Sequence, residues 1–520
     1  MNLLLQVLTN TTLSHNILIL LLVFIFSLLG LLAQNLRGNK DGKTKKYPPG
    51  PTRFPLIGNL HQITELPHIS FKKLSDKYGP IMFLKLGSIP TLVVSSANIV
   101  KEMFTAHDLV FSNRPMLYAA KKFSYEFVDI TFAPYGEYWR EVRKITMAEL
   151  LSVKRVQSFR AVREEEVATL IELIHRSSSS LTLINLSEMI LCFVNNVICR
   201  VAFGRKYEEE IDTNGKSKFH RLIKETHDLL AGFCMADFFP RLAWLHKIDG
   251  TEAKLEKTFR QMDDFYEKVI DEHLNPQRLT PAVEDLVDVL LRVQKNPGQG
   301  ITVSREQIKG VITDIFGAGS DTSSAAIVWA MTELIRNPEV MKKAQEDVRR
   351  SVGDKEVVEE SDLPKLKYLK LVTKEAMRHH PPAPLLVPRE TTQNCTIKGY
   401  HVPAKTRVFI AAKAIGMDPK VWENPSEFRP ERFLNNDIDV KGQDFELIPF
   451  GVGRRGCPGV NFSVVLVELT LANLLHCVDW KLPSGMKPEE VDIEEADGLT
   501  MHKKIPLCLL AETATACKFA

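Results

Sequence analysis

The chain has little net charge: its 520 residues carry 67 Lys and Arg against 64 Asp and Glu, a formal charge of +3. A protein whose main partner is nucleic acid usually has a strongly basic domain or stripe, so the composition argues against that class. The sequence also lacks low-complexity tracts and repeats with a period of about 20 to 50 residues. With 44% hydrophobic and 25% charged residues, it excludes a disordered chain, a collagen-like fibre and a polytopic membrane protein.

Cysteine is scarce, with eight residues in the whole chain and no C-x-x-C pair. That number is too small for a disulfide-stabilised scaffold, and the spacing does not predict a zinc site. The sequence therefore favours a reducing compartment that faces the cytosol. Only Cys457 has neighbours that predict chemistry.

One long hydrophobic run, residues 17–33, contains no charged side chain. As a helix it would span roughly 25 Å, close to the thickness of the endoplasmic reticulum bilayer. No Lys or Arg precedes the run, whereas Arg37, Lys40 and Lys43 follow it, and positive charge stays on the cytosolic side. A cleaved signal peptide would need a basic stretch before the run. We therefore expect residues 1–36 to form a signal anchor with a single transmembrane segment at about 17–33.

Residues 37–58 are basic and rich in proline, with Pro48, Pro49 and Pro51 close together. Successive prolines favour a stiff, extended segment with few internal hydrogen bonds. The plain interpretation of the segment is a linker. The more specific one is a semi-rigid spacer that sets the orientation of the following domain on the membrane, and the two interpretations are compatible. Residues 59–520 are then expected to form one large domain.

Hydrophobic periodicity within this domain is mostly helical. Residues 81–86 and 91–94 predict a pair of strands that turns at Gly87 and Ser88. Three helices stand out. They are expected at about 304–336, where Ser304 is the N-cap and Asn337-Pro338 ends the helix, at about 368–379, and from Pro458 to about residue 477. The sequence thus predicts a mainly α fold with small β-sheets.

The segment FGVGRRGCPG, from Phe450 to Gly459, fits the pattern F-x-x-G-x-R-x-C-x-G. Average residue frequencies would produce this pattern by chance roughly once in ten thousand chains of this length. Its glycines allow unusual backbone conformations and the close approach of a flat ligand. The amides at the start of the following helix, with Arg455 nearby, are expected to hold the sulfur of Cys457 as a thiolate. A lone cysteine is more often a small buried hydrophobe, but this spacing favours a binding loop.

This loop resembles the haem-binding loop of the cytochrome P-450 family. The chain resembles that family from the proline-rich hinge to near the C-terminus, and the hinge, the segment FAPYGEYWR and the motif AGSDTS resemble its large plant microsomal A-type group. The resemblance implies the cytochrome P-450 fold, a single large haem domain. In that family a cysteine thiolate is the proximal ligand of the iron of haem b, so the resemblance assigns Cys457 as the metal ligand.

A second motif is Glu375-Ala376-Met377-Arg378, in which Glu and Arg share one face of the predicted helix. The pattern alone is common in this chain. Its position about eighty residues before Cys457, followed by FRPERF, resembles the family's structural triad, with Arg432 as the third member. The resemblance implies a buried network beneath the haem. Interrupting such a network is strongly destabilising, so the change Glu375→Ala is expected to prevent haem incorporation.

A third motif, Ala318-Gly319-Ser320-Asp321-Thr322, lies midway along the longest predicted helix. Glycine costs about 1 kcal/mol relative to alanine in a helix, so the small residues leave room for something bulky. A carboxylate next to a hydroxyl suits proton delivery, although a small-residue packing face is the plainer interpretation. The motif resembles the family's A-G-x-D-T oxygen-activation groove. The resemblance assigns Asp321 and Thr322 as catalytic residues of a proton relay.

Haem carboxylates require cations. Trp139 and Arg143 have the i, i+4 spacing of the family's W-x-x-x-R contact to a haem propionate, and Arg389 in VPRE and Arg455 in the haem loop resemble two further contacts. The planar guanidinium fork suits a carboxylate. Each arginine alone would more often be a surface residue, but the resemblance at all four positions, together with Cys457, predicts the cofactor-binding set.

The resemblance also indicates which segments face the substrate, and most of them are apolar. They are 118–132, 229–239, the helix near Asp314 and Ala318, 385–387 and 499–501. Such a lining favours a small lipophilic substrate that is held by shape. Phe233, Phe238, Phe239 and Trp244 fit either a core position or contact with the membrane.

Together these features predict a haem-thiolate monooxygenase of the endoplasmic reticulum membrane, with a single transmembrane pass and a cytosolic catalytic domain. It would use O2, with NADPH electrons delivered by a cytochrome P-450 reductase and with cytochrome b5 as an additional partner, to oxidise a plant specialised metabolite. Terpenoid, alkaloid and phenylpropanoid substrates all remain open, as do hydroxylation, epoxidation, ring closure and rearrangement. The alternatives are a reductase-independent haem-thiolate isomerase or dehydratase and a non-catalytic membrane haem sensor.

Overall fold

The structure, a computed structural model, describes residues 45–178, 182–207, 218–232, 234–279, 283–296 and 303–514. The expected anchor at 1–36 and the first part of the expected hinge lie outside these residues. Within them, helices dominate and the strands form three small sheets of four, three and two strands. The predicted mainly α fold with small β-sheets is confirmed.

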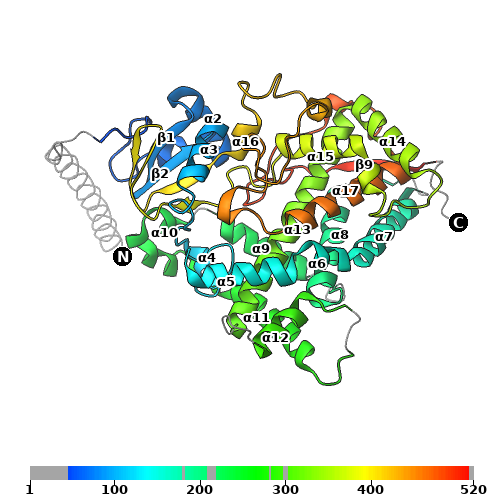
Figure 1. The fold of residues 1–520 in the computed structure, drawn as a ribbon, viewed down its shortest axis with the longest axis horizontal. Helices are drawn as coiled ribbons and strands as arrows, with labels where there is room; N and C mark the ends of the chain where they lie inside the picture. The colour runs from blue at the N-terminus through cyan, green and yellow to red at the C-terminus, as the bar shows by residue number, and fades with distance from the viewer. Residues whose placement is uncertain are drawn as a thin grey trace, which may run out of the picture.

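Most helices gather into one body around a long central helix, α13, while β1, β2, α2 and α3 lie together at one side (Figure 1). The α-helices of the described residues are α2 (Pro67–Tyr78), α3 (Ala97–Ala106), α4 (Tyr118–Phe123), α5 (Glu137–Ile145), α6 (Val153–Ser158), α7 (Arg160–Ser178), α8 (Leu186–Phe203), α9 (Lys218–Ala231), α10 (Met235–Phe238), α11 (Thr251–Leu274), α12 (Leu286–Lys295), α13 (Arg305–Arg336), α14 (Pro338–Val352), α15 (Lys367–His379), α16 (Ala412–Gly416) and α17 (Val460–Cys477).

The largest sheet has the order β1-β2-β7-β4. The strands are β1 (Ile81–Leu86), β2 (Ile89–Val94), β3 (Ile184–Asn185), β4 (Arg389–Glu390), β5 (Cys395–Ile397), β6 (Tyr400–Val402), β7 (Arg407–Ile410), β8 (Val478–Lys481) and β9 (Cys508–Thr513). β1 and β2 form the predicted antiparallel pair, whereas β2 and β7 pair in parallel with Thr91 opposite Arg407. The sheet therefore joins the beginning of the described domain to its last third.

Helix α13 is the axis of the fold. A capping box between Ser304 and Gln307 begins it, and Asn337 caps its C-terminal end, as the sequence predicts. Its 32 residues make a rod about 48 Å long, which packs against α8, α15 and α17. At Gly319 a Cβ would lie 3.1 Å from the side chain of Ile198 on α8, so glycine permits this close approach.

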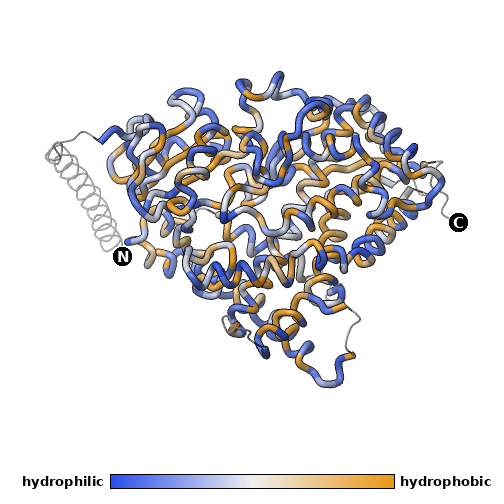
Figure 2. Tube along the Cα trace, in the orientation of Figure 1, coloured by the Kyte–Doolittle hydropathy of each residue, from blue (hydrophilic) through white to orange (hydrophobic). Residues whose placement is uncertain are grey.

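The hydrophobic core surrounds this rod. Residues of α7, α8, α13, α15 and α17 share one buried cluster, and the hydrophobic colour follows the central helices in Figure 2. Helices α8 and α17 are long and apolar enough to cross a membrane, but 61% and 67% of these segments are buried inside the protein. They are therefore core helices of the domain.

Candidate active site

The loop that precedes α17 carries the conspicuous cysteine. It turns at Gly451 and Gly453, whose φ angles of 71° and 65° lie in the left-handed region that favours glycine. At Gly453 a Cβ would also lie 2.5 Å from a carboxylate oxygen of Asp108. The amide of Cys457 donates to the carbonyl of Phe450 at 2.8 Å. This bond closes the loop and fixes the cysteine just before the helix.

The sulfur of Cys457 has a different environment from the one expected. It accepts a hydrogen bond from the amide of Gly459 at 3.3 Å, as predicted. The guanidinium that favours its charged form, however, belongs to Arg143 and not to Arg455. Burial raises the pKa of the thiol, and this effect outweighs the Gly459 amide and Arg143. A metal ion bound to the sulfur would oppose this shift and favour the thiolate.

A cavity of about 330 Å³ lies between this loop and α13. Cys457 lines it on one side, and Gly317, Ala318, Gly319 and Thr322 of α13 line it on the other. Most of the remaining lining is apolar. It includes Phe123, Ile130, Phe132, Leu150, Leu151, Phe159, Ile198, Val201, Leu230, Ile315, Ala326, Leu386, Val387, Phe450, Phe462 and Leu499.

All five segments expected to face the substrate contribute to this lining, four of them through at least two residues each. The fifth, 229–239, contributes only Leu230. Beyond it, α10 packs against the turn between β1 and β2, where the carbonyl of Phe238 accepts a hydrogen bond from the amide of Ser88 at 2.9 Å. Thr226 and His227, one turn earlier on α9, line the cavity instead.

The aromatic residues of this region have different surroundings. Phe238 and Phe239 are half-buried, and Trp244 is 56% exposed. Phe233 lies outside the described residues. Trp244 is therefore on the surface, and neither it nor the two phenylalanines line the cavity.

Four arginines line the cavity near the loop: Arg114, Arg143, Arg389 and Arg455. In the described part of the chain, none of them forms an ion pair with an acidic side chain, and their hydrogen bonds all go to backbone carbonyls. The acceptors are Thr131, Val387 and Pro388 for Arg114, Gly456 for Arg143, Phe111 and Val452 for Arg389, and Ser112, Ile130 and Ala133 for Arg455.

These guanidinium groups crowd one another. Burial lowers the pKa of Arg389 to about 10 and that of Arg455 to about 9, and the charge of Arg389 contributes to the second shift. Burial and the charges of Arg389 and Arg455 also hold the pKa of Arg114 well below its usual range. A ligand that carries carboxylates would relieve this repulsion. Sequence reasoning missed Arg114, because no local motif marks it.

Trp139 does not line the cavity. Its indole donates to the carbonyl of Ile130 at 2.9 Å. The guanidinium of Arg455 lies over the ring at 4.0 Å from its centroid, and that of Arg143 lies at 5.8 Å. The structure thus places Trp139 behind the arginines, where cation–π contacts hold two of them in place.

Asp321 and Thr322 lie side by side on α13, as the motif requires. The Thr322 hydroxyl donates to the carbonyl of Ala318 at 2.7 Å, which orients it. Asp321 is bound by two histidines that sequence reasoning missed. Nε2 of His502 lies 2.7 Å from one carboxylate oxygen, and Nδ1 of His227 lies 3.3 Å from the other.

The two histidines determine the charge of Asp321. Burial would raise its pKa, but the hydrogen bonds from His227 and His502 and their charges outweigh burial and hold the pKa well below its usual range. Burial would likewise lower the pKa of His227, but the hydrogen bond and charge of Asp321 raise it. The carboxylate is therefore ionised and has hydrogen-bond donors on both oxygens.

A second carboxyl group of α13, that of Asp314, also faces the cavity wall. It accepts hydrogen bonds from the amides of Ile130 and Thr131, at 2.5 and 3.1 Å, and it interacts with Asp129. Burial raises the pKa of both acids, and the nearby charge of Asp314 raises that of Asp129 further. We interpret the pair as sharing a proton, an arrangement that ties α13 to the loop before α5.

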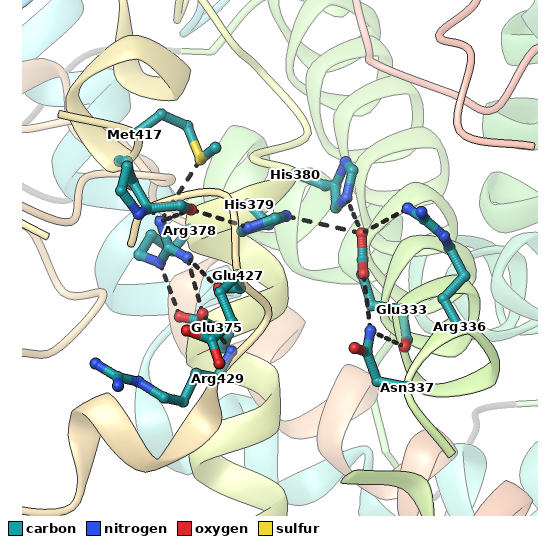
Figure 3. Close-up of polar contacts among 12 residues, drawn as sticks. Glu333, Arg336, Asn337, Glu375, Arg378, His379, His380, Met417, Glu427 and Arg429 are labelled. Carbon is teal, nitrogen blue, oxygen red and sulfur yellow. Dashed lines mark hydrogen bonds and ion pairs between the residues drawn. The ribbon is translucent and has the colours of Figure 1, made fainter. Parts of the chain in front are cut away.

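Glu375 on α15 forms the expected triad. Its carboxylate binds Arg378 at 2.7 Å and Arg432 at 2.9 Å, and the Glu375 and Arg378 side chains are completely buried. Figure 3 shows Glu375 and Arg378 pointing toward each other beside a second cluster around Glu333. Arg378 also donates to the carbonyls of Gly416 and Pro425. The triad therefore fixes α15 to the segments that lead to the cysteine loop.

A mainly helical fold with a cysteine loop facing an apolar, arginine-rimmed cavity is typical of haem-thiolate proteins. The chain belongs to the cytochrome P450 family, whose family model, described as Cytochrome P450, matches residues 48–509.

Its similarity to individual members spans nearly the whole chain. It is 55% identical over 475 residues to a protein named Strychnine-11-hydroxylase from Strychnos nux-vomica, covering 91% of this chain and 93% of the relative. It is 57% identical over 483 residues to Cytochrome P450 71A9 from Glycine max, covering 92% and 96%. A solved zebra fish cytochrome P450, a structure with progesterone, has a TM-score of 0.74 at 25% identity and covers 87% of this chain and 100% of that one.

The protein is therefore a plant A-type cytochrome P450. It is a monooxygenase that carries haem b, receives NADPH electrons through a reductase and oxidises a lipophilic specialised metabolite. The residues present fit the cofactor. Cys457 presents its sulfur to the cavity, the four arginines have no acidic partners among the described residues and could bind carboxylates, and the loop glycines leave room for a flat ring.

Proposed function

We propose that Cys457 would bind the haem iron through its sulfur and that Arg143, Arg389 and Arg455 would bind the haem carboxylates, with Arg114 as a fourth cation. The observation that carries this proposal is the group of cavity arginines whose hydrogen bonds all go to backbone carbonyls. Trp139 acts by stacking against Arg455. When bound, the haem supplies the activation of O2 and the insertion of one oxygen atom into the substrate.

In the same proposal, Thr322 and Asp321 move protons on the cavity side of α13. Thr322 offers a hydroxyl that its bond to Ala318 holds in the cavity wall. Asp321, the preceding residue, holds a carboxylate whose two oxygens face imidazole groups. Proton exchange among groups fixed at such distances is the usual form of acid–base catalysis in proteins.

We further propose that the reaction is hydroxylation and that the substrate is an alkaloid. Support comes from the relative named Strychnine-11-hydroxylase, 55% identical over 91% of this chain. The largely apolar cavity favours a rigid, lipophilic molecule that is bound mainly by shape. The alternative that the protein is a reductase-independent isomerase loses support, because Asp321, Thr322 and the complete cysteine loop are all present.

The membrane arrangement is part of the proposal: an anchor at 1–36 with its transmembrane segment at 17–33, a hinge at 37–58, and a haem domain at 59–520 on the cytosolic side of the endoplasmic reticulum. An exposed apolar surface supports it. Leu56 and Ile57 of the hinge are 66% and 40% exposed, and Trp244 and Ile248 are 56% and 74% exposed. The β1–β2 turn connects the two groups, since the Gly87 amide donates to Ile57 and that of Ser88 to Phe238.

Product analysis by mass spectrometry tests the proposed activity. The full chain would be expressed in microsomes with a plant reductase and offered alkaloids, terpenes and phenylpropanoids, with and without NADPH. We expect an NADPH-dependent alkaloid product with one additional oxygen atom. A product formed without NADPH would favour the isomerase, whereas haem-loaded protein without any product would favour the sensor. Added cytochrome b5 should raise the rate, and alkaline carbonate extraction should leave the protein in the membrane.

Two substitutions test the site. Cys457→Ser should abolish the thiolate-specific absorption band of the reduced carbon monoxide complex, whereas Cys192→Ser, a change on the surface of α8, should leave it intact. Thr322→Ala should keep the haem but release peroxide at the expense of product. A Thr322→Ala enzyme that forms product with the wild-type yield per NADPH would contradict the proposed relay.

A further inference from the structure

The carboxylate of Asp321 lies between two histidines that come from distant parts of the chain. His227 belongs to α9, and His502 belongs to the segment that leads to β9. Nδ1 of His227 lies 3.3 Å from Oδ2 of Asp321, and Nε2 of His502 lies 2.7 Å from Oδ1. Each carboxylate oxygen therefore has its own imidazole.

The two imidazoles lie on opposite sides of Asp321. His227 lines the cavity, and its Nε2 lies 3.3 Å from the position that a Cβ would take at Gly317. His502 does not line the cavity, yet 37% of its side chain is exposed, against 14% for Asp321 and 14% for His227. The exposed surface of His502 therefore lies outside the cavity, on the solvent side of Asp321.

Backbone hydrogen bonds hold His502 in its position. The indole of Trp329, on the same helix as Asp321, donates to the carbonyl of Met501 at 2.6 Å. The amide of Met501 donates to Pro382 at 2.9 Å, and the carbonyl of His502 accepts from Ala496 at 2.9 Å. Hydrogen bonds thus hold the backbone of Met501 and His502 in place. The imidazole of His502 is therefore fixed next to Asp321 by the fold.

We propose that His502 is a positioning residue that resupplies Asp321 with protons from solvent, while His227 holds the same carboxylate from the cavity side. This inference rests on the proposed role of Asp321. The charged imidazole of His502 gives its Nε2 proton to Oδ1 of Asp321 and becomes neutral, with its other proton on Nδ1. Once Asp321 has passed its proton on toward Thr322, Nε2 takes up a proton from a hydronium ion of the solvent, which leaves water. Only N–H and O–H bonds form and break.

Within the described ranges, few other charged groups lie near the cluster. In addition to the charge of Asp321, that of Asp228, the next residue on α9, raises the pKa of His227. The pKa of Asp321 is lowered by His227 and His502. Lys503 follows His502 but contacts Asp492. The proton supply to Asp321 should therefore depend on the two histidines.

The test compares full-length, haem-loaded enzyme variants with reductase and the first substrate identified. His502→Gln removes the titratable donor and keeps a hydrogen-bonding side chain. We expect kcat to fall about tenfold, less than the loss of a direct acid–base group because water partly replaces the imidazole. KM should stay near the wild-type value, the solvent isotope effect on kcat should increase, and the wild-type pH dependence of kcat should disappear.

Two further variants make the result specific. His502→Lys keeps a cation on Asp321 that titrates only at alkaline pH, so it should restore kcat and move the alkaline limit of the profile upward. If His502→Gln binds less haem, this lysine variant carries the test. The matched control is His68→Gln, because His68 also pairs with a carboxylate, that of Glu495, but lies outside the cavity. It should behave like the wild type.

Asp321→Asn separates failure of the inference from failure of the proposed relay. If Asp321→Asn is impaired while His502→Gln keeps the wild-type kcat, pH profile and isotope effect, the role of His502 is wrong and that of Asp321 stands. If Asp321→Asn itself turns over like the wild type, the relay is wrong and the inference falls with it. A purely structural clamp predicts that His502→Gln and His502→Lys lose activity equally at every pH.

Discussion

Two carboxylates of this protein each bind two basic side chains, but the basic residues and their surroundings differ. Glu375 binds two arginines, and its own side chain is completely buried. Asp321 binds His227 and His502 between the cavity and solvent. Arginine keeps its charge at every physiological pH, whereas histidine gains and loses a proton near neutrality.

The choice of arginine or histidine separates a cluster that only supports the fold from one that can also exchange protons. A permanently charged, buried cluster cannot pass a proton, but it holds α15 in place under all conditions. A histidine cluster with one exposed member can exchange protons with water, but its contribution to stability depends on pH. The protein thus uses arginine beneath the cysteine loop and histidine beside the proposed path of the protons.

A third carboxylate shows that burial can keep a histidine neutral even when it is paired with an acid. Glu333, on α13, binds His380 at 2.7 Å, with His379 nearby (Figure 3). Burial lowers the pKa of His380 to about 4, although Glu333 opposes the shift. His380 is therefore neutral at physiological pH, and it stacks on Trp329 with parallel rings 4.0 Å apart. Histidine alone does not make a proton route, because access to solvent is also needed.

The largest expected effect comes from removing the centre of the arginine cluster. Glu375→Ala leaves Arg378 and Arg432 buried without their carboxylate, which costs about 3–5 kcal/mol of stability. We expect almost no haem-loaded protein, measured as haem per polypeptide after purification. Glu423→Ala is the control, because this side chain is 76% exposed and pairs with Arg429 at the surface. Normal haem loading of Glu375→Ala would contradict a structural role for the triad.

A smaller effect should follow from making the arginine cluster titratable. In Arg432→His the new imidazole pairs with Glu375 only when protonated, so its pKa is raised in the folded state. The stability that it adds is present at low pH and lost as pH rises through that pKa. We expect the free energy of unfolding to fall by about 2 kcal/mol between about pH 6 and pH 8.5. Urea titrations at both pH values measure this change, and Arg429→His, near the surface, should show no such step.

The converse change makes the histidine cluster insensitive to pH. The pKa of His227 is raised by Asp321, so the charged pair is complete below about pH 6.5 and is lost as pH rises through the folded pKa. The wild-type KM should rise about threefold over that range as α9 loosens from α13. His227→Gln should have a higher KM that does not change with pH. Parallel profiles for the two enzymes would rule out this role of His227.

The last effect concerns the stability contributed by an acid without a strong partner. Burial raises the pKa of Glu468, on α17, to about 7, so the folded state loses stability as pH rises from about 4.5 through 7. Glu468→Gln removes that loss and should stabilise the protein by about 1–2 kcal/mol at pH 8.5, with no gain at low pH. Thermal unfolding at both pH values measures the gain. Glu346→Gln, an exposed change on α14, should have no effect.

The sequence predicted the features that depend on neighbouring residues. The strand pair, the cap at Ser304, the end of α13 at Asn337 and the turn at Cys457 all arise from interactions within a few residues, so spacing reveals them. α17 begins at Val460, two positions later than expected, because Gly459 is its N-cap. The triad was also predicted, although only through resemblance, since Arg432 lies far from Glu375 in sequence.

The sequence could not show the contacts that only folding creates. His227 and His502 lie on segments with no motif in common with Asp321, and Arg114 resembles any surface arginine until its three carbonyl acceptors are seen. The cation that favours the charged form of Cys457 was expected to be Arg455, whereas it is Arg143. The approach of Arg143 to the loop, where it donates to the carbonyl of Gly456, depends on the arrangement of α5, which spacing along the chain does not encode.

The parallel pairing of β2 with β7 has a consequence for the synthesis of this protein. The paired residues lie about 300 positions apart, and a ribosome adds about 5–20 residues per second. The hairpin of β1 and β2 therefore waits about 15–60 s before its partner strand emerges. During that time one edge of an apolar strand pair is open to association with other chains. Any factor that slows translation after β2 should increase aggregation of the nascent chain before it alters the finished enzyme.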